Sequence, residues 1–199
     1  AALPQVELHH RAAGLVPVPL LNPASRSVDG IELRPETDAD LEFLQGLYAS
    51  SREREMAMLP HWTGEQKREF LEMQFKAQRG HYRQHYPDAR FDVIERGGVA
   101  IGRLYVAEQG REFILMDITL VPASRNSGLG TQLCRAVMDE AAQKGKIVSL
   151  HVEDENPARR LYDRLGFVEV GEVTFYKLMH WVPRGLQQLS DELAAEQQS

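Results

Sequence analysis

Residues 120–130 read Leu-Val-Pro-Ala-Ser-Arg-Asn-Ser-Gly-Leu-Gly, which is a strand end, a loop with two close glycines and an immediate helix start. The backbone N–H groups from Asn126 to Thr131 point out of the first turn of such a helix, with the positive end of its dipole behind them. Gly128 and Gly130 let a diphosphate approach without a Cβ in the way. The segment therefore predicts an anion site suited to pyrophosphate. Alone it is weak evidence, because many helices begin with glycine for turn geometry only.

Two common phosphate-binding patterns are excluded. The Lys-Ser/Thr pair of an NTP-binding Walker loop is missing after the glycines. The glycines also follow a predicted antiparallel meander, whereas a dinucleotide-binding loop follows the first strand of a parallel βαβ unit. The loop is therefore predicted to bind a diphosphate ligand through neither an NTP-binding Walker loop nor a dinucleotide-binding fold.

The chain before this loop is predicted to form a strand, two helices and three more strands. Alternation marks the first strand, and helical spacing of apolar residues marks the helices, with Thr37 and Thr63 as their caps. Glycine turns separate the later strands, which gives an antiparallel meander. The predicted ranges are 31–34 for the strand, 37–48 and 63–85 for the helices, an irregular segment at 50–62, and 91–95, 99–107 and 112–120 for the meander.

The chain after the loop is predicted to alternate helix and strand. Leu129, Leu133, Val137 and Ala141 recur at steps of four, and Gly145 closes that helix. A strand at 146–153 follows, then a helix with Asn156 as N-cap and Pro157 in its first turn, which Gly166 stops, and then strands at 167–170 and 173–179. We divide the chain into a proline-containing arm at 1–30, a domain at 31–181, and a tail at 182–199 with an amphipathic helix that packs or forms a homodimer contact.

Two motifs carry a resemblance to a known family. Arg125-x-x-Gly128-x-Gly130, after a strand and a Val-Pro pair, is similar to motif A of the GNAT superfamily of N-acetyltransferases. About thirty residues on, Leu150-His-Val152 followed by Asn156-Pro-Ala-Arg-Arg-Leu-Tyr162-Asp-Arg-Leu-Gly-Phe167 resembles its motif B. The resemblance implies an α/β (α+β) fold with a mixed, mostly antiparallel sheet flanked by helices, and strands splayed around a groove for coenzyme A.

The resemblance also implies which residues hold acetyl-CoA, the acyl donor. Strand backbone in the gap would bind the pantetheine arm and the loop would bind the diphosphate. Asn156 would also bond the pantetheine, a role that its use as an ordinary N-cap does not exclude. The residues so assigned are Ile118, Leu120, Val121, Arg125, Asn126, Ser127, Gly128, Leu129, Gly130, Thr131 and Asn156.

Tyr162 stands where many family members carry the tyrosine that protonates the departing thiolate. Attack of an amine on a thioester creates an oxyanion and expels a sulfur anion, so a backbone N–H and a phenol lower successive barriers. Tyr162 could instead only pack beside Leu161 and Leu165. An alkylamine has a reference pKa of about 10.4 and must lose a proton first. Asp117, Glu112 and Glu153 are candidate bases, and a water chain is an equal alternative.

The composition indicates which binding partners and which cellular compartment to expect. The 199 residues include 29 acidic and 23 basic side chains, a formal charge of −6, which disfavours nucleic acid as a partner. Cys134 is the only cysteine, so no intramolecular disulfide and no cysteine-rich zinc site is expected. His81 and His85 lack a third ligand, so we expect no metal. The only early apolar stretch, at 12–21, contains two prolines, and we expect a cytoplasmic protein without a membrane span.

The predicted function is N-acetylation of a primary amine, on a small molecule or a peptide, by direct attack on acetyl-CoA. By the resemblance, the acceptor site would be bordered by Met56, Met58, Trp62 and Tyr105. These residues could equally well belong to the hydrophobic core. The alternatives are a catalytically weak acyl-CoA-binding sensor or interaction module of the same fold, and a structural homo-oligomer without a ligand. The sequence does not name the acceptor.

Overall fold

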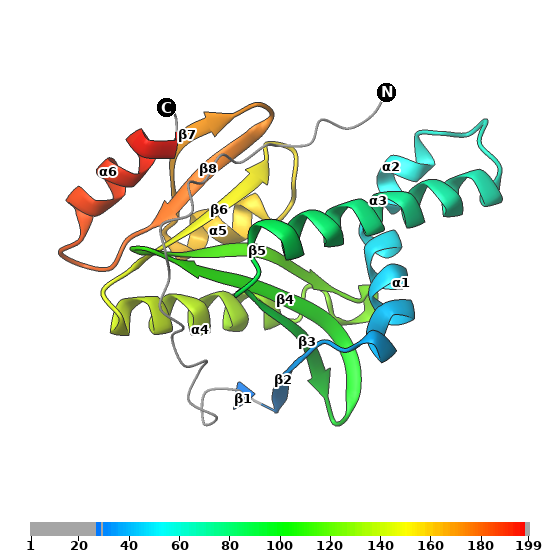
Figure 1. The fold of residues 1–199 in the computed structure, drawn as a ribbon, viewed down its shortest axis with the longest axis horizontal. Coiled ribbons are helices and arrows are strands. Elements are labelled where there is room, and N and C mark those ends of the chain that lie inside the picture. The colour runs from blue at the N-terminus through cyan, green and yellow to red at the C-terminus, as the bar shows by residue number, and fades with distance from the viewer. Residues whose placement is uncertain (1–26, 29, 198–199) are drawn as a thin grey trace.

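The computed structural model describes residues 27–28 and 30–197 and shows a sheet with helices on both faces (Figure 1). Most of the predicted arm and residues 198–199 lie outside the described residues. Within the described ranges, no helix is both long and apolar enough to cross a bilayer. The elements are β1 (Ser27–Val28), β2 (Ile31–Pro35), α1 (Leu41–Ser51), α2 (Glu53–Ala57), α3 (Gly64–His85), β3 (Arg90–Arg96), β4 (Val99–Gln109), β5 (Glu112–Leu120), α4 (Leu129–Gln143), β6 (Ile147–Glu153), α5 (Arg159–Leu165), β7 (Val168–Val173), β8 (Tyr176–Trp181) and α6 (Gln187–Gln197).

The strands form one sheet in the order β1-β2-β3-β4-β5-β6-β8-β7. Every neighbouring pair is antiparallel except β5 and β6, which run parallel. This confirms the predicted mixed, mostly antiparallel sheet. The two-residue β1 was not predicted as a strand, and it pairs with the start of β2.

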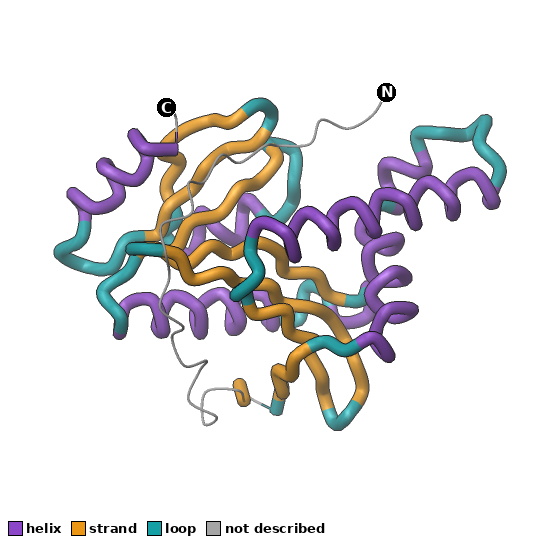
Figure 2. Tube along the Cα trace, in the orientation of Figure 1, coloured by secondary structure: helices purple, strands orange, loops and turns teal. Residues whose placement is uncertain are grey.

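The two faces of the sheet carry different helices (Figure 2). The largest apolar cluster lies between the sheet and helices α4 and α5, and Leu129, Leu133 and the lone Cys134 are buried in it. A second cluster holds α1 and α3 against the other face through Leu44, Tyr48, Phe75 and Val93. Because successive strand residues point to opposite faces, Val93 and its neighbour Ile94 belong to different clusters.

Helix boundaries follow the predicted signals in most places. Thr63 begins α3 with a capping box, in which Thr63 Oγ1 accepts from the Gln66 N–H at 3.2 Å and Gln66 Oε1 accepts from the Thr63 N–H at 2.8 Å. Gly145 follows α4 with a φ of 63°, as a left-handed cap requires.

Three boundary predictions were wrong. The segment at 50–62 contains the short helix α2, whose five residues are too few to show a period. Helix α5 begins at Arg159 and not at Pro157, because an Asn156–Arg159 turn precedes it. The last two strands are shifted along the chain from the predicted 167–170 and 173–179: β7 ends at Val173 and β8 spans Tyr176–Trp181, since the hairpin turns at 174–175, where Thr174 adopts a φ of 61°.

Gly102 allows β4 and β5 to approach closely. It lies opposite Leu120, and a Cβ added there would be 2.5 Å from the Thr119 carbonyl oxygen and 2.8 Å from Leu120 Cδ2. We therefore expect Gly102→Ala to lower the free energy of unfolding in urea by about 1–3 kcal/mol. The control is Gly80→Ala in exposed α3, where nothing lies within 4 Å of the added methyl and a gain of about 0.5–1 kcal/mol is expected. Equal stability changes in the two variants would contradict this assignment.

Helix α6 is attached to the sheet by a buried histidine. Leu189 and Leu193 pack on Ile147, as the predicted tail helix requires. His180 on β8 is fully buried, and its Nδ1 lies 2.9 Å from Ser190 Oγ on α6. Its Nε2 is buried without a hydrogen-bond partner among the described residues. Burial lowers the pKa of His180, and the charge of Glu112 opposes this only in part.

This histidine makes stability fall on the acid side. Because the pKa of His180 is lower in the folded chain than in the unfolded chain, the unfolded chain binds the proton first as the pH falls below about 6.5. We expect the free energy of unfolding to decrease between about pH 7 and pH 5. A His180→Gln variant should be less stable than the parent at both pH values, but its free energy of unfolding should decrease less between them. The control is His61→Gln at an exposed site, which should show the same decrease as the parent. An identical decrease in the His180→Gln variant would assign the effect to other groups.

Candidate functional site

The site is a gap in the sheet between two neighbouring parallel strands. β5 and β6 pair only through residues 112–114 and 147–149, and these fully described strands make no pairing with each other beyond that point. β5 stays paired with β4 up to Leu120, and β6 stays paired with β8 up to Glu153. Both strands therefore continue in the sheet while their facing edges separate, as the resemblance implied.

Backbone groups of β5 face this gap at alternate residues. The Val121 N–H donates to the Ile101 carbonyl of β4 at 2.9 Å, so Val121 points its amide away from the gap. Because alternate residues of a strand direct their N–H and C=O to opposite sides, Ile118 and Leu120 direct theirs into the gap. Of the three strand residues predicted to bind pantetheine, two are thus placed to do so through the backbone.

A β-bulge at Met116 shapes the wall of the gap, and it was not predicted. Tyr105 lies opposite Asp117 and Val106 opposite Leu115, which leaves Met116 as an extra residue. The bulge brings Asp117 onto the sheet face covered by α3, whereas without it Asp117 would share a face with buried Leu115. Tyr82 of α3 donates to the Met116 carbonyl at 3.3 Å and so holds the bulge from that side. No sequence signal marks this extra residue.

The predicted anion loop has the backbone needed for a diphosphate. Gly128 is the N-cap of α4 with a φ of 85°, and Asn126 also adopts a positive φ, of 58°. A Cβ at Gly128 would meet nothing within 4 Å, so this glycine borders open space at the helix N-terminus. The first N–H groups of a helix have no partner within it. The open space at Gly128 leaves room for an anion at this helix N-terminus. A Cβ added at Gly130 would lie 3.4 Å from Leu161 Cδ2, at van der Waals contact.

The side chain of Arg125 is turned away from this cradle. Its Nε donates to the Leu120 carbonyl at 2.9 Å, and its Nη2 donates to Ser50 Oγ at 2.9 Å and to the Ser50 carbonyl at 3.2 Å. The guanidinium therefore links the end of β5 to α1. A contribution of Arg125 to diphosphate binding would come from its backbone.

Tyr162 of α5 packs edge-on against Phe167, with ring centroids 5.6 Å apart. Its side chain belongs to the main apolar cluster and is 7% exposed. Burial raises the pKa of Tyr162 far above its ordinary value, and the charges of Cys134 and Asp117 raise it further. The phenol thus keeps its proton throughout the neutral range. Tyr162 and Ile118 of β5 belong to the same apolar cluster, so α5 and β5 approach each other on this face of the sheet.

Asp117 is held by a buried arginine. Arg103, which is 2% exposed, donates through Nη2 at 2.6 Å and through Nε at 3.2 Å to this carboxylate. Thr119 Oγ1 donates to it at 2.7 Å, and Gln78 accepts from the same Arg103 nitrogen. A proton taken by Asp117 would leave a guanidinium with a neutral partner in the interior, which is costly. Asp117 of β5 therefore helps to hold β5 against β4 through its ion pair with Arg103.

Glu153 lies at the other side of the open end, opposite Tyr176 in the β6–β8 pairing. Burial raises the pKa of Tyr176, and the carboxylate of Glu153 raises it further. Glu112, the third candidate base, is buried at the closed end where β5 and β6 still pair. Asn156 is exposed next to Glu153, and its Oδ1 accepts from the Ala158 N–H at 2.9 Å. Its amide nitrogen is not used in that bond.

Apart from Tyr105, several side chains near the site were not singled out from the sequence. Tyr48 and Arg52 at the end of α1 act on Tyr176, and Asp117 acts on Tyr82 and Tyr105 as well as on Tyr162. Tyr105 donates to Glu36, a carboxylate with 1% side-chain exposure that also pairs with Arg79 and Arg83. Periodicity places such residues on helices or strands, but only the tertiary fold brings them to one end of a gap.

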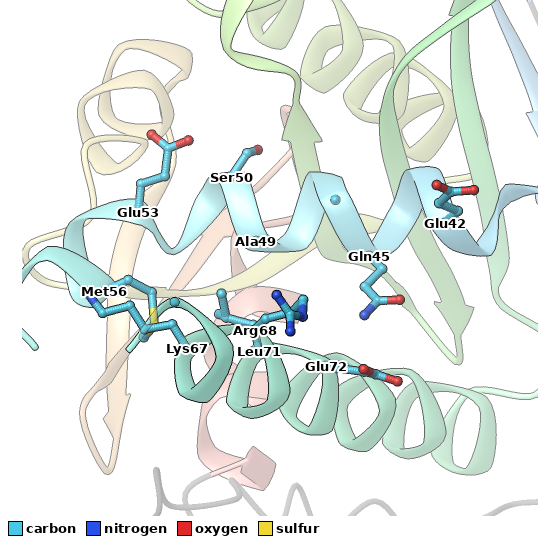
Figure 3. Close-up of a pocket in the computed structure, with 12 residues that line it drawn as sticks. Glu42, Gln45, Ala49, Ser50, Glu53, Met56, Lys67, Arg68, Leu71 and Glu72 are labelled. Atoms are coloured by element: carbon cyan, nitrogen blue, oxygen red, sulfur yellow. The ribbon is translucent and has the colours of Figure 1, made fainter. Parts of the chain in front are cut away.

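A separate groove runs between α1 and α3 (Figure 3). It has a volume of about 630 Å³ and includes Ser50, the partner of Arg125, and Met56, but none of the residues predicted to be catalytic. Met58 and Trp62 are 73% and 38% exposed on the connection between α2 and α3, which projects from the body in Figure 1. These two side chains are therefore placed apart from the tyrosines at the open end of the gap. Among the described residues, no cluster of three or more potential metal ligands is present.

Comparison with known proteins identifies the family. The sequence matches the acetyltransferase (GNAT) family over residues 55–167. Comparison with curated proteins gives no match. The structure is similar to that of the PaiA N-acetyltransferase from Thermoplasma acidophilum in complex with coenzyme A, with 19% identity, 77% of this chain and 99% of that chain covered, and a TM-score of 0.59.

Two further solved structures are similar. For a putative GNAT-family acetyltransferase from Bordetella pertussis the identity is 19%, the coverage is 77% of this chain and 96% of that chain, and the TM-score is 0.52. For the spermidine N-acetyltransferase from Vibrio cholerae in complex with CoA and spermine, the identity is 21%, the coverage is 77% of this chain and 94% of that chain, and the TM-score is 0.51. At these identities the structures show a common fold. Together with the family match, they establish that this chain belongs to the GNAT family of acetyltransferases.

Proposed function

We propose that the protein transfers an acetyl group from acetyl-CoA to a primary amine. The observation that supports this proposal is the gap between β5 and β6, whose β5 side leads to a helix N-terminus with open space at Gly128. Tyr162 is buried in the same apolar cluster as Ile118 of β5 and Val152 of β6. An elongated donor with a diphosphate in its middle and a thioester at one end matches these features in that order. When bound, acetyl-CoA supplies the thioester from which the acyl group is taken.

The chain would bind and orient this donor mainly through its backbone. The N–H groups of residues 126–131 would donate hydrogen bonds to the diphosphate oxygens, with the dipole of α4 behind them. The groups of Ile118 and Leu120 that face the gap would pair with the amides of pantetheine, much as an added strand pairs with a sheet edge. The Leu120 carbonyl is already taken by Arg125, so its N–H is the group left for the ligand. Asn156 has its side-chain amide nitrogen available for the same arm.

Tyr162 would act as the general acid. As the new C–N bond forms and the C–S bond breaks, the sulfur leaves with the bonding electron pair and needs a proton. The Tyr162 hydroxyl retains its proton because the raised pKa keeps the phenol neutral, and it lies on the α5 side of the gap. The Met116 bulge lies in the opposite wall, where backbone N–H groups would face the carbonyl oxygen as its charge grows.

The amine must give up a proton before or during attack, and Glu153 is the best placed of the three candidate bases. Its carboxylate lies at the open end. The neighbouring Tyr176 has a hydroxyl group that can stabilise the negative charge of this carboxylate through a hydrogen bond. Asp117 already accepts from Arg103 and Thr119, so protonation there would break a buried ion pair. We therefore propose that the proton leaves through Glu153, directly or through water.

A thiol-release screen tests this function. Purified protein is incubated with acetyl-CoA and, one at a time, with amino acids, polyamines, amino sugars and peptides, and the free CoA thiol is measured. We expect release that depends on the amine, and the Gly128→Asp variant should abolish it. Saturable acetyl-CoA binding without release for any amine would instead indicate a module that binds acyl-CoA and does not transfer it.

A further inference from the structure

Side chains from the end of α1, from β6 and from β8 lie at the open end of the gap. Arg125 attaches the end of β5 to Ser50 near the end of α1, which places Arg52, two residues later, at the same end of the gap. The Arg52 guanidinium lies over the ring of Tyr48, 5.5 Å from its centroid. On the other strand of the gap, Glu153 at the end of β6 lies opposite Tyr176 of β8. The open end therefore has a cation near its β5 side and an anion on its β6 side.

Arg52 is incompletely satisfied in this position. One of its nitrogens, Nη1, donates to Glu55 at 3.0 Å, in a pair three residues apart on the same helical segment. Its Nε is buried and has no hydrogen-bond partner among the described residues. A buried guanidinium N–H without a partner is costly, and a half-exposed pair such as Arg52–Glu55 contributes little to hold the side chain there. These features suit a group whose missing partner arrives with the substrate.

We propose that the acceptor is a zwitterion, a small molecule with a carboxylate as well as its primary amine, and that Arg52 binds the carboxylate. This inference rests on the proposed acyl transfer. Carboxylate is the natural partner because its two oxygens match the fork of N–H groups on a guanidinium. Glu153, of opposite charge, lies across the opening, where it would face the ammonium group. The two ends of an amino acid would thus meet groups of opposite sign.

This charge arrangement disfavours a polyamine. A polyamine carries a second cation where this chain presents Arg52, and the resulting contact between like charges reduces affinity. A neutral or singly charged amine without a carboxylate would leave the Arg52 Nε as it is, without a partner. Discrimination by a missing partner of a buried polar group is strong in enzymes.

Matched substrate pairs test the inference. Each pair consists of an amino acid and the amine formed by its decarboxylation, such as lysine with cadaverine and phenylalanine with phenethylamine, and kcat/KM is measured by thiol release. For the pair that is accepted, we expect the amino acid to be favoured about 10–100-fold, the effect of one charge-assisted contact. Arg52→Gln should remove that preference by lowering kcat/KM for the amino acid only, and Arg52→Lys should restore part of it. Arg54→Gln, an exposed change two residues away, is the matched control and should leave both rates unchanged.

The outcomes separate this inference from the function on which it rests. Equal or better use of the decarboxylated amines, or a preference for the amino acid that survives Arg52→Gln, overturns the role of Arg52 while amine acetylation stands. Absence of thiol release with every amine, in protein that binds acetyl-CoA, contradicts the proposed function and this inference together. Loss of the preference in Arg52→Gln alone supports it.

Discussion

Replacing Tyr162 with phenylalanine is expected to lower kcat by about 10²–10⁴-fold, the range of a general acid, while the Kd for acetyl-CoA changes little. The phenylalanine ring keeps the packing of Tyr162 against Phe167 and in the main cluster, so only the hydroxyl is lost. Because the pKa of Tyr162 is raised far above its ordinary value, the parent enzyme should show no loss of activity from its ionisation at neutral or mildly alkaline pH. Steady-state kinetics of thiol release and calorimetry with acetyl-CoA give the two quantities.

The matched control for this variant is Tyr86→Phe. Tyr86 is also buried, and its pKa is raised to about 12 by burial above all, but it packs in a different cluster with Ala107 and Ile114. Removal of that hydroxyl should affect stability and not kcat. If Tyr162→Phe keeps nearly full turnover under conditions where chemistry limits the rate, Tyr162 only packs beside its neighbours.

Gly128→Asp is expected to abolish acetyl-CoA binding while the chain still folds. The added carboxylate enters the open space at the N-terminus of α4, where the diphosphate is proposed to lie. Contact of like charges costs several kcal/mol, so affinity should fall about 100-fold or more. Calorimetry with acetyl-CoA measures the loss, and circular dichroism checks the fold.

Gly128→Asn is the control that isolates charge. Asparagine has the same shape as aspartate and tolerates the left-handed conformation that a φ of 85° demands, so both variants pay the same backbone cost. We expect the asparagine variant to bind acetyl-CoA much more tightly than the aspartate variant. Equal affinity of the two, or parent-like affinity of a folded Gly128→Asp protein, would place the diphosphate elsewhere.

Local sequence signals account for the order of elements and for the loop of the site. The Gly128-x-Gly130 pair, the four-residue steps of α4 and the glycine turns of the meander each have a local physical cause, and the structure confirms the elements they predict. The parallel β5–β6 pair and its early end also agree with what the two motifs implied. The loop, the helix and the turns depend on backbone conformation and periodicity, which neighbouring residues determine, whereas the separation of β5 from β6 was implied only by the family resemblance.

Features that depend on tertiary contact were not predictable in the same way. The bulge at Met116 decides that Asp117 faces α3 and meets Arg103, and a strand pattern alone does not reveal an extra residue. The direction of the Arg125 side chain depends on Ser50, which lies far from it in sequence. Arg52 and Tyr176 were missed for the same reason, because only the packing of α1 against the sheet brings them to the gap.

The central claim is that one acetyl group passes from acetyl-CoA to an amine at this gap. The most direct measurement follows both products of a single reaction, the free thiol by colorimetry and the acceptor by mass spectrometry. Acetyl transfer at this gap should give one acetylated amine for each thiol released, with no release when the amine is omitted and none with Gly128→Asp. Thiol release that does not depend on the amine, or an acceptor whose mass does not change, would contradict it.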